Sequence, residues 1–114
     1  MVELSTERFE ELVADALDGI PADLGEAMEN VAVMVDSLAP PGRLLGLYEG
    51  VPLTARGTSY SAAMPDRITI FKRSICAAAD TEEDVVDTVR RTVIHEVAHH
   101  FGISDQRLNE LGWG

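Results

Sequence analysis

The chain has 114 residues, enough for one hydrophobic core and too few for two, so we expect a single domain over residues 1–114. Its net charge of −11, from 9 basic and 20 acidic side chains, would repel a phosphate backbone, and we expect no nucleic-acid partner. No stretch approaches the roughly 18 apolar residues of a membrane span. Residues 1–11 are polar and acidic, unlike a signal peptide, so we expect no membrane partner and a cytoplasmic protein.

The first third of the chain is predicted to form a helix followed by a strand. Ser5 or Thr6 can cap this helix, and Gly19 and Pro21 end it. A further helical turn fits residues 23–28. Residues 31–35 are β-branched and apolar on both faces, which is typical of a central strand, and a Pro-Pro-Gly break follows at residues 40–42. Apolar residues recur at helical spacing in the first helix: Phe9, Leu12, Val13, Ala16, Leu17 and Ile20.

The rest of the chain is predicted to add two strands and two helices. Residues 44–48 and 67–71 fit strands, separated by a loop over residues 49–65 that is rich in Gly, Ser, Thr and Pro. The main helix begins after Thr81, which forms a capping-box pattern with Asp84, and it runs to about Phe101. A short helix is predicted over residues 106–111. These elements predict an α+β fold, in which a small mixed sheet packs on a central helix with flanking helices.

All three histidines lie near the end of the predicted main helix, in the segment from His95 to Asp105. His95 and His99 are four residues apart, so they lie on one helix face and can aim at one point. Glu96 projects to the side of that pair. Gly102 can adopt the positive φ that ends the helix, which would turn Asp105 back toward the histidines. Three such ligands with an open fourth position are typical of catalytic Zn²⁺, so the segment predicts a zinc site with Glu96 beside it.

The spacing His-Glu-x-x-His followed by Gly-x-x-Asp resembles that of the zincin metallopeptidases, with aspartate replacing the third histidine of the metzincins. Residues 48–52 (Tyr-Glu-Gly-Val-Pro), 65–71 (Pro-Asp-Arg-Ile-Thr-Ile-Phe) and 111–113 (Leu-Gly-Trp) make the whole chain similar to the small bacterial minimal-zincin family. The resemblance implies a minimal zincin-like domain that binds zinc through His95, His99 and Asp105. It also implies that Glu96 is the general base. Metzincins carry a methionine turn after the third ligand, but no methionine follows Asp105 here, so the floor of the site must differ.

The resemblance also implies how a peptide substrate would bind. In zincins a peptide adds to an edge strand above the metal, and the resemblance assigns this role to Arg67–Phe71. Only residues 106–114 follow the last ligand, so one wall of the cleft is expected to be low. We therefore expect an open groove that accepts short or unfolded peptides and acts poorly on folded proteins.

Several other polar residues are candidates for roles near the site. The helical position of His100 places it near the apolar stripe, which favours a hydrogen-bonded core histidine over a catalytic one. Tyr48 and Tyr60 are candidate oxyanion donors, although packing is the expected role of both. For Arg56 and Arg67 we expect surface pairing with carboxylates. None of these residues is predicted to be catalytic.

Two alternative functions compete with that of a zinc metallopeptidase. The motif is also similar to the His-x-x-x-His-x-x-Gly-x-Asp-His pattern of bacterial ribosomal-RNA maturation endoribonucleases, but Gln106 replaces the last histidine and the chain is strongly negative. The other alternative is a zinc-stabilised binding module without turnover, against which the presence of Glu96 argues. Mn²⁺, Co²⁺ or Ni²⁺ can also occupy a site with nitrogen and oxygen ligands.

Overall fold

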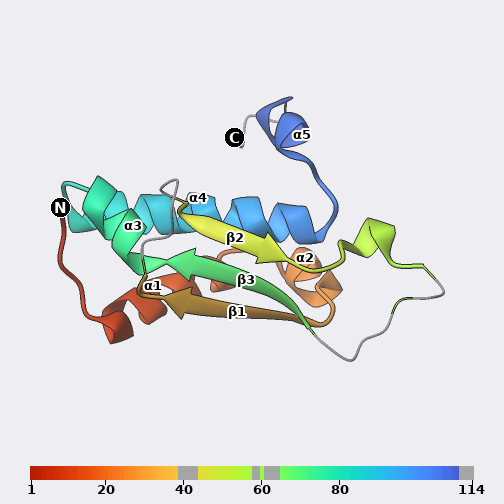
Figure 1. Cartoon of the computed structure of the whole chain (residues 1–114), viewed down its shortest axis with the longest axis horizontal. Helices are drawn as coiled ribbons and strands as arrows, with labels where there is room; N and C mark the ends of the chain where they lie inside the picture. The colour runs from red at the N-terminus through yellow and green to blue at the C-terminus, as the bar shows by residue number, and fades with distance from the viewer. Residues whose placement is uncertain (39–43, 58–59, 61–64, 111–114) are drawn as a thin grey trace.

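The computed structural model describes residues 1–38, 44–57, 60 and 65–110. It has the predicted α+β fold, in which a small mixed sheet packs against helices (Figure 1). The helices are α1 (Thr6–Asp18), α2 (Ala22–Ala27), α3 (Lys72–Ala78), α4 (Glu82–His100) and α5 (Asp105–Glu110). The strands are β1 (Val31–Asp36), β2 (Gly46–Glu49) and β3 (Asp66–Phe71), and a 3-10 helix, η2, spans Leu53–Ala55.

The strands of the sheet lie in the order β1-β3-β2. β1 runs parallel to β3, with Val31 opposite Asp66, and β2 runs antiparallel to β3, with Gly46 opposite Ile70. The prediction that residues 31–35 form a central strand is therefore wrong, because β1 lies at an edge. Its apolar residues are only partly buried, and Met34 is 43% exposed. Apolar composition on both faces does not reveal which strand receives hydrogen bonds on both sides.

The ends of the helices follow local sequence signals. Ser5 accepts a hydrogen bond from the backbone N–H of Arg8 at the start of α1, at 3.0 Å. At the start of α4, the Thr81 hydroxyl accepts from the Asp84 N–H, and the Asp84 carboxylate accepts from the Thr81 N–H, which confirms the capping box. The short helix α3 was not predicted. It is a single segment of seven residues directly after β3, too short for apolar periodicity to stand out.

The hydrophobic core lies between the sheet and the two long helices. α4 packs along β2 and β3, and α1 packs beside α4 and reaches β1 (Figure 1). Ile68 and Ile70 point from β3 into this core, and the Cys76 side chain is buried there among apolar residues. None of the helices in the described part of the chain is long and apolar enough to cross a membrane. The fully buried apolar residues from the long helices are Phe9, Val85, Val89 and Val93.

Candidate metal centre

The C-terminal end of α4 turns the chain back toward the histidines. The N–H of Gly102 donates to the carbonyl of His99, and the N–H of Ile103 donates to the carbonyl of Ala98, each at 2.9 Å. This pair of bonds is a Schellman motif, which requires a left-handed residue after the helix, and Gly102 supplies a φ of +83°. The helix therefore stops at His100, and α5 begins three residues after Gly102, at Asp105.

The turn brings Asp105 against both histidines that the motif singles out. Its Oδ1 atom lies 2.9 Å from His95 Nε2 and 2.7 Å from His99 Nε2. Two ligand atoms of a tetrahedral zinc ion lie roughly 3.4 Å apart. The Asp105 oxygen would therefore have to move about half an ångström or slightly more away from the histidine nitrogens for a zinc ion to fit between them. Hydrogen bonding from His99, and more weakly from His95, holds the pKa of the Asp105 carboxyl below its usual value. Two nitrogens and one oxygen converging on one point suit a divalent transition metal.

Glu96 lies on the inner side of this group, between α4 and β2. Its side chain is buried, and its Oε1 atom lies 3.1 Å from His99 Nδ1. The strand and helix approach closely here, since a Cβ atom on Gly46 would lie 3.2 Å from the Cγ of Glu96. Both ring nitrogens of His99 thus face carboxylate oxygens, Glu96 on one side and Asp105 on the other.

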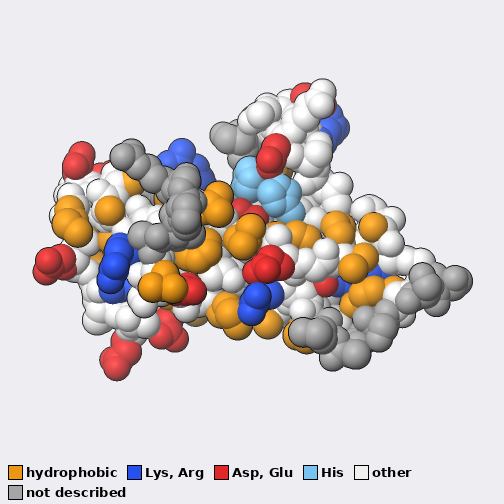
Figure 2. Space-filling model, viewed as in Figure 1, with side chains coloured by type: hydrophobic (Ala, Val, Ile, Leu, Met, Phe, Trp, Pro, Cys, Tyr) orange, Lys and Arg blue, Asp and Glu red, His pale blue; other side chains and the backbone are white. Residues whose placement is uncertain are grey.

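Two different carboxylates could complete a metal site with the histidines. His95, Glu96 and His99 form a group whose potential ligand atoms lie within 4.8 Å of one another. Asp105 Oδ1, however, lies within 3 Å of the Nε2 atoms of both histidines, whereas Glu96 contacts Nδ1 of His99 alone. The geometry therefore favours Asp105 as the third donor and leaves Glu96 beside the site. Figure 2 shows histidine side chains at the surface below α5, and His95 and His99 are the two that are partly exposed, at 33% and 26%.

A second polar cluster lies next to the metal centre and is buried. Its centre is Asp66, which is 3% exposed at the start of β3. The Asp66 Oδ2 atom accepts hydrogen bonds from the Tyr48 hydroxyl, from Arg56 at 2.7 Å and from His100 Nδ1 at 3.2 Å, and Oδ1 accepts from the Val51 N–H at 3.0 Å. We call these five residues the Asp66 cluster. Sequence reasoning did not find it, because its members come from four separate segments.

The cluster fixes the state of His100, which is fully buried as predicted. The backbone N–H of Glu29 donates to His100 Nε2 at 3.2 Å, so Nε2 is an acceptor and the hydrogen of a neutral ring sits on Nδ1, facing Asp66. Burial lowers the pKa of His100, although the nearby Asp66 carboxylate opposes that shift. His100 is therefore a neutral, hydrogen-bonded core residue.

The structure also shows the contacts of the two tyrosines and two arginines that the sequence offered as candidates near the site. The Tyr48 hydroxyl donates to Asp66, and burial together with that bond raises its pKa, so it is not free to donate to a substrate. The Tyr60 hydroxyl accepts from Asn30 at 3.0 Å. Arg67 forms the expected exposed pair, with Glu49 at 3.1 Å. The expectation of a surface pair for Arg56 is wrong, because its side chain is 9% exposed and its partner is the buried Asp66.

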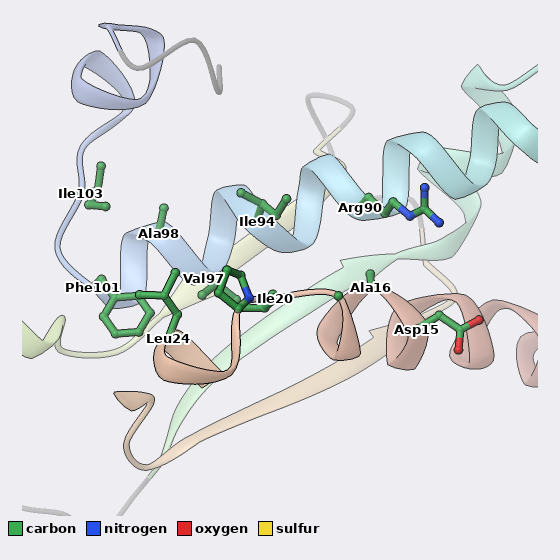
Figure 3. Close-up of a pocket in the computed structure, with 12 residues that line it drawn as sticks. Asp15, Ala16, Ile20, Leu24, Arg90, Ile94, Val97, Ala98, Phe101 and Ile103 are labelled. Atoms are coloured by element: carbon green, nitrogen blue, oxygen red, sulfur yellow. The ribbon is translucent and has the colours of Figure 1, made fainter. Parts of the chain in front are cut away.

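An apolar groove of about 600 Å³ lies on another face of α4 (Figure 3). Ile20 and Leu24 form its lower wall, and Ile94 and Ala98 of α4 form its upper edge, directly before His95 and His99 in the sequence. None of the four motif residues, His95, Glu96, His99 and Asp105, lines the groove. The groove and the metal centre are therefore separate features that share one helix. Its other lining residues are Asp15, Ala16, Gly19, Pro21, Arg90, Val97, Phe101 and Ile103.

Comparisons with known proteins identify a matching family and a similar structure. A family model described as zincin-like metallopeptidase matches residues 25–113, which include both the metal centre and the Asp66 cluster. A solved structure of a conserved hypothetical protein from Thermo thermophilus is similar, with a TM-score of 0.58 and 26% sequence identity. The match covers 95% of this chain and 97% of that protein. No curated protein matches the chain significantly.

Proposed function

Because the chain belongs to the zincin-like metallopeptidase family, we propose that it is a zinc-dependent peptidase that acts on short or unfolded peptides. In this proposal His95, His99 and Asp105 bind zinc and Glu96 is the general base. The observation that carries it is that the Oδ1 atom of Asp105 lies within 2.9 Å of the Nε2 atoms of both His95 and His99. Zinc, when bound, supplies a Lewis acid that polarises a carbonyl group and makes water more acidic.

The position of Glu96 supports its role as the proton carrier. The residue follows His95 directly, and its carboxylate lies between His99 and the strand β2. From there it would accept a proton from the attacking water and deliver it to the leaving amine. Burial limits the access of bulk water to this carboxylate, which favours transfer within the site over exchange with solvent.

The arrangement of strands changes the proposed substrate-binding strand. Arg67–Phe71 lies within β3, which is the central strand, so the expectation that this segment binds the peptide is wrong. The edge strand beside α4 is β2. The Phe71 N–H donates to the Leu45 carbonyl, so by alternation the backbone groups of Gly46 and Tyr48 point away from β3. We propose that a peptide pairs with these outward groups and crosses the metal centre beside His99.

Metal analysis followed by peptide cleavage tests the proposal. Wild type, His99→Ala and Asp105→Ala would be purified without an affinity tag or added metal, and Asp87→Ala, an exposed acid on α4, is the matched control. We expect about one zinc per chain in wild type and control, with loss in both ligand variants. Cleavage of a mixed-peptide library should be sensitive to chelators.

Two results would overturn the proposal. Wild-type protein that takes up no metal would remove its basis. Stoichiometric zinc without cleavage of any peptide would instead favour a zinc-stabilised binding module.

A further inference from the structure

The carboxylate of Asp66 joins segments that are far apart in the sequence. It receives hydrogen bonds from β2 through Tyr48, from the two ends of the segment Val51–Arg56, and from the last turn of α4 through His100. An unpaired carboxylate at 3% exposure would be strongly destabilising, and this set of donors offsets that cost. Asp66 therefore holds three parts of the chain at one point.

One connection leads from Asp66 into the metal-binding helix. His100 follows the proposed ligand His99 in the last turn of α4, and its ring is held on both sides, by Asp66 and by the N–H of Glu29. A side chain fixed at both ring nitrogens restricts rotation of that turn about the helix axis. The direction of the neighbouring His99 side chain is restricted with it.

The second connection leads to the turn before Asp105. The Arg56 side chain donates to the Val51 carbonyl at 2.8 Å and to Asp66, which closes the segment Val51–Arg56 into a compact loop. At the middle of this loop, Thr54 packs so closely on Gly102 that a Cβ atom there would lie 2.1 Å from the Thr54 Oγ1. The loop thus forms the support for the Gly102 turn, which directs the chain toward Asp105.

Gly50 shows how closely the start of this loop approaches Asp66. It has a φ of +147°, and a Cβ atom on it would lie 2.2 Å from the Asp66 Oδ1 atom. A side chain at this position would displace the carboxylate. The start of the loop is therefore held against Asp66 by this close approach, and the end of the loop is held there by Arg56.

We propose that Asp66 is a positioning residue for the metal centre. Through His100 it orients the last turn of α4, and through the loop Val51–Arg56 it supports the turn that brings Asp105 to the histidines. The inference rests on the proposed function, because it assumes that these residues bind metal. Residues that orient metal ligands without touching the ion commonly change metal affinity by about 10–100-fold when replaced.

The test is metal affinity in a folded protein whose ligands are intact. Zn²⁺ affinity would be measured by chelator competition, and the visible spectrum of bound Co²⁺ would report the coordination geometry. Asp66→Asn is expected to weaken Zn²⁺ binding about tenfold or more and to change the Co²⁺ spectrum. The measurements are made at a temperature at which circular dichroism shows every variant to be folded.

Two further variants separate positioning from general loss of stability. Val85→Ala removes buried volume from the first half of α4, far along the helix from the ligands, and should lower the melting temperature without changing metal affinity. Thr54→Ala removes an exposed side chain that supports Gly102, and should weaken Zn²⁺ binding severalfold with little change in stability. This second variant decides the question if Asp66→Asn does not fold.

The outcomes distinguish this inference from the proposed function. If wild type binds no metal, the proposed function fails. If wild type binds Zn²⁺ and both Asp66→Asn and Thr54→Ala bind it equally well, the inference fails and the proposed function stands. An equal loss of affinity in Asp66→Asn and Val85→Ala would mean that Asp66 contributes only stability, which also overturns the inference.

Discussion

Two consecutive histidines at the end of α4 each pair with an aspartate, and the two pairs differ in exposure. His99 lies 2.7 Å from Asp105, with side chains 26% and 70% exposed, whereas His100 lies 3.2 Å from Asp66, with side chains 0% and 3% exposed. In the buried pair, every partner is supplied by the protein and the ring has one defined tautomer. The exposed pair is accessible to an ion. Burial, rather than residue type, separates a structural pair from a candidate metal-binding pair.

The helix itself creates this difference. Consecutive side chains on an α-helix point about 100° apart, so His99 and His100 face different surroundings. Tyr48 of β2, Asp66 of β3 and the backbone N–H of Glu29 contact the buried His100 ring, while Asp105 at the start of α5 contacts the partly exposed His99 ring.

Glu96→Gln should abolish peptide hydrolysis while metal binding is retained. The amide cannot accept the proton from the attacking water, and general-base catalysis commonly contributes about 10²–10⁴-fold. Turnover and zinc content would be measured together, with Glu83→Gln in the exposed first turn of α4 as the control. Loss of zinc together with activity would show that Glu96 is structural, and the proposed mechanism would then be wrong.

Asp66→Asn should destabilise the metal-free protein far more than Asp105→Ala. Replacing Asp66 leaves Arg56 buried without a counter-charge, a change that costs about 3–5 kcal/mol. Asp105 is largely exposed, so its removal should change the free energy of unfolding by no more than about 0.5 kcal/mol. Urea unfolding in the presence of a chelator measures both. Equal effects would contradict the contrast between the two pairs.

Gly102→Ala should reduce both stability and metal affinity. The φ of +83° is unfavourable for alanine by about 1–2 kcal/mol, and the added Cβ atom would contact Thr54. Gly25→Ala is the matched control, because it lies in α2 with open space around it and should be neutral or slightly stabilising. Thermal unfolding and Zn²⁺ competition measure the two effects. Unchanged Zn²⁺ affinity in Gly102→Ala would show that the turn does not control the position of Asp105.

Asp66 should also make stability depend on pH in the acid range. Burial alone would raise the pKa of Asp66, but hydrogen bonds from Tyr48, Val51, Arg56 and His100 outweigh burial and hold it below its usual value. The carboxyl group of the unfolded chain, with a pKa of about 3.9, therefore takes up a proton first as the pH falls. The contribution of Asp66 is present above about pH 4 and is lost as the pH falls through the folded-state pKa. As the pH falls from about 5 to about 3, the urea midpoint of the metal-free protein should decline less steeply in Asp66→Asn than in wild type. If the midpoints of the two proteins decline in parallel, Asp66 does not cause the pH dependence.

Local signals in the sequence predicted the long helices α1 and α4, but not α3, and they predicted which residues lie together at the end of α4. The capping box of Thr81 and Asp84, the four-residue spacing of His95 and His99, and the glycine that ends α4 all act within a few residues of one another. The predictions that residues 31–35 form a central strand and that residues 67–71 form an edge strand were both wrong, because β1 is an edge strand and β3 is the central one. Strand order depends on contacts between segments that are more than thirty residues apart, such as Val31 and Asp66. Periodicity within one segment carries no information on that order.

The sequence by itself determined the α4 helix, its end at Gly102 and the grouping of His95, Glu96, His99 and Asp105, because helical geometry relates side chains at fixed short spacings. Only the tertiary structure decided which histidine is sealed in the core and which is open at the surface. It also decided that β2 is the strand beside the metal centre and that Asp66 joins three distant segments. These features depend on how strands and loops pack over the helix. Packing arises from long-range burial, which no local spacing encodes.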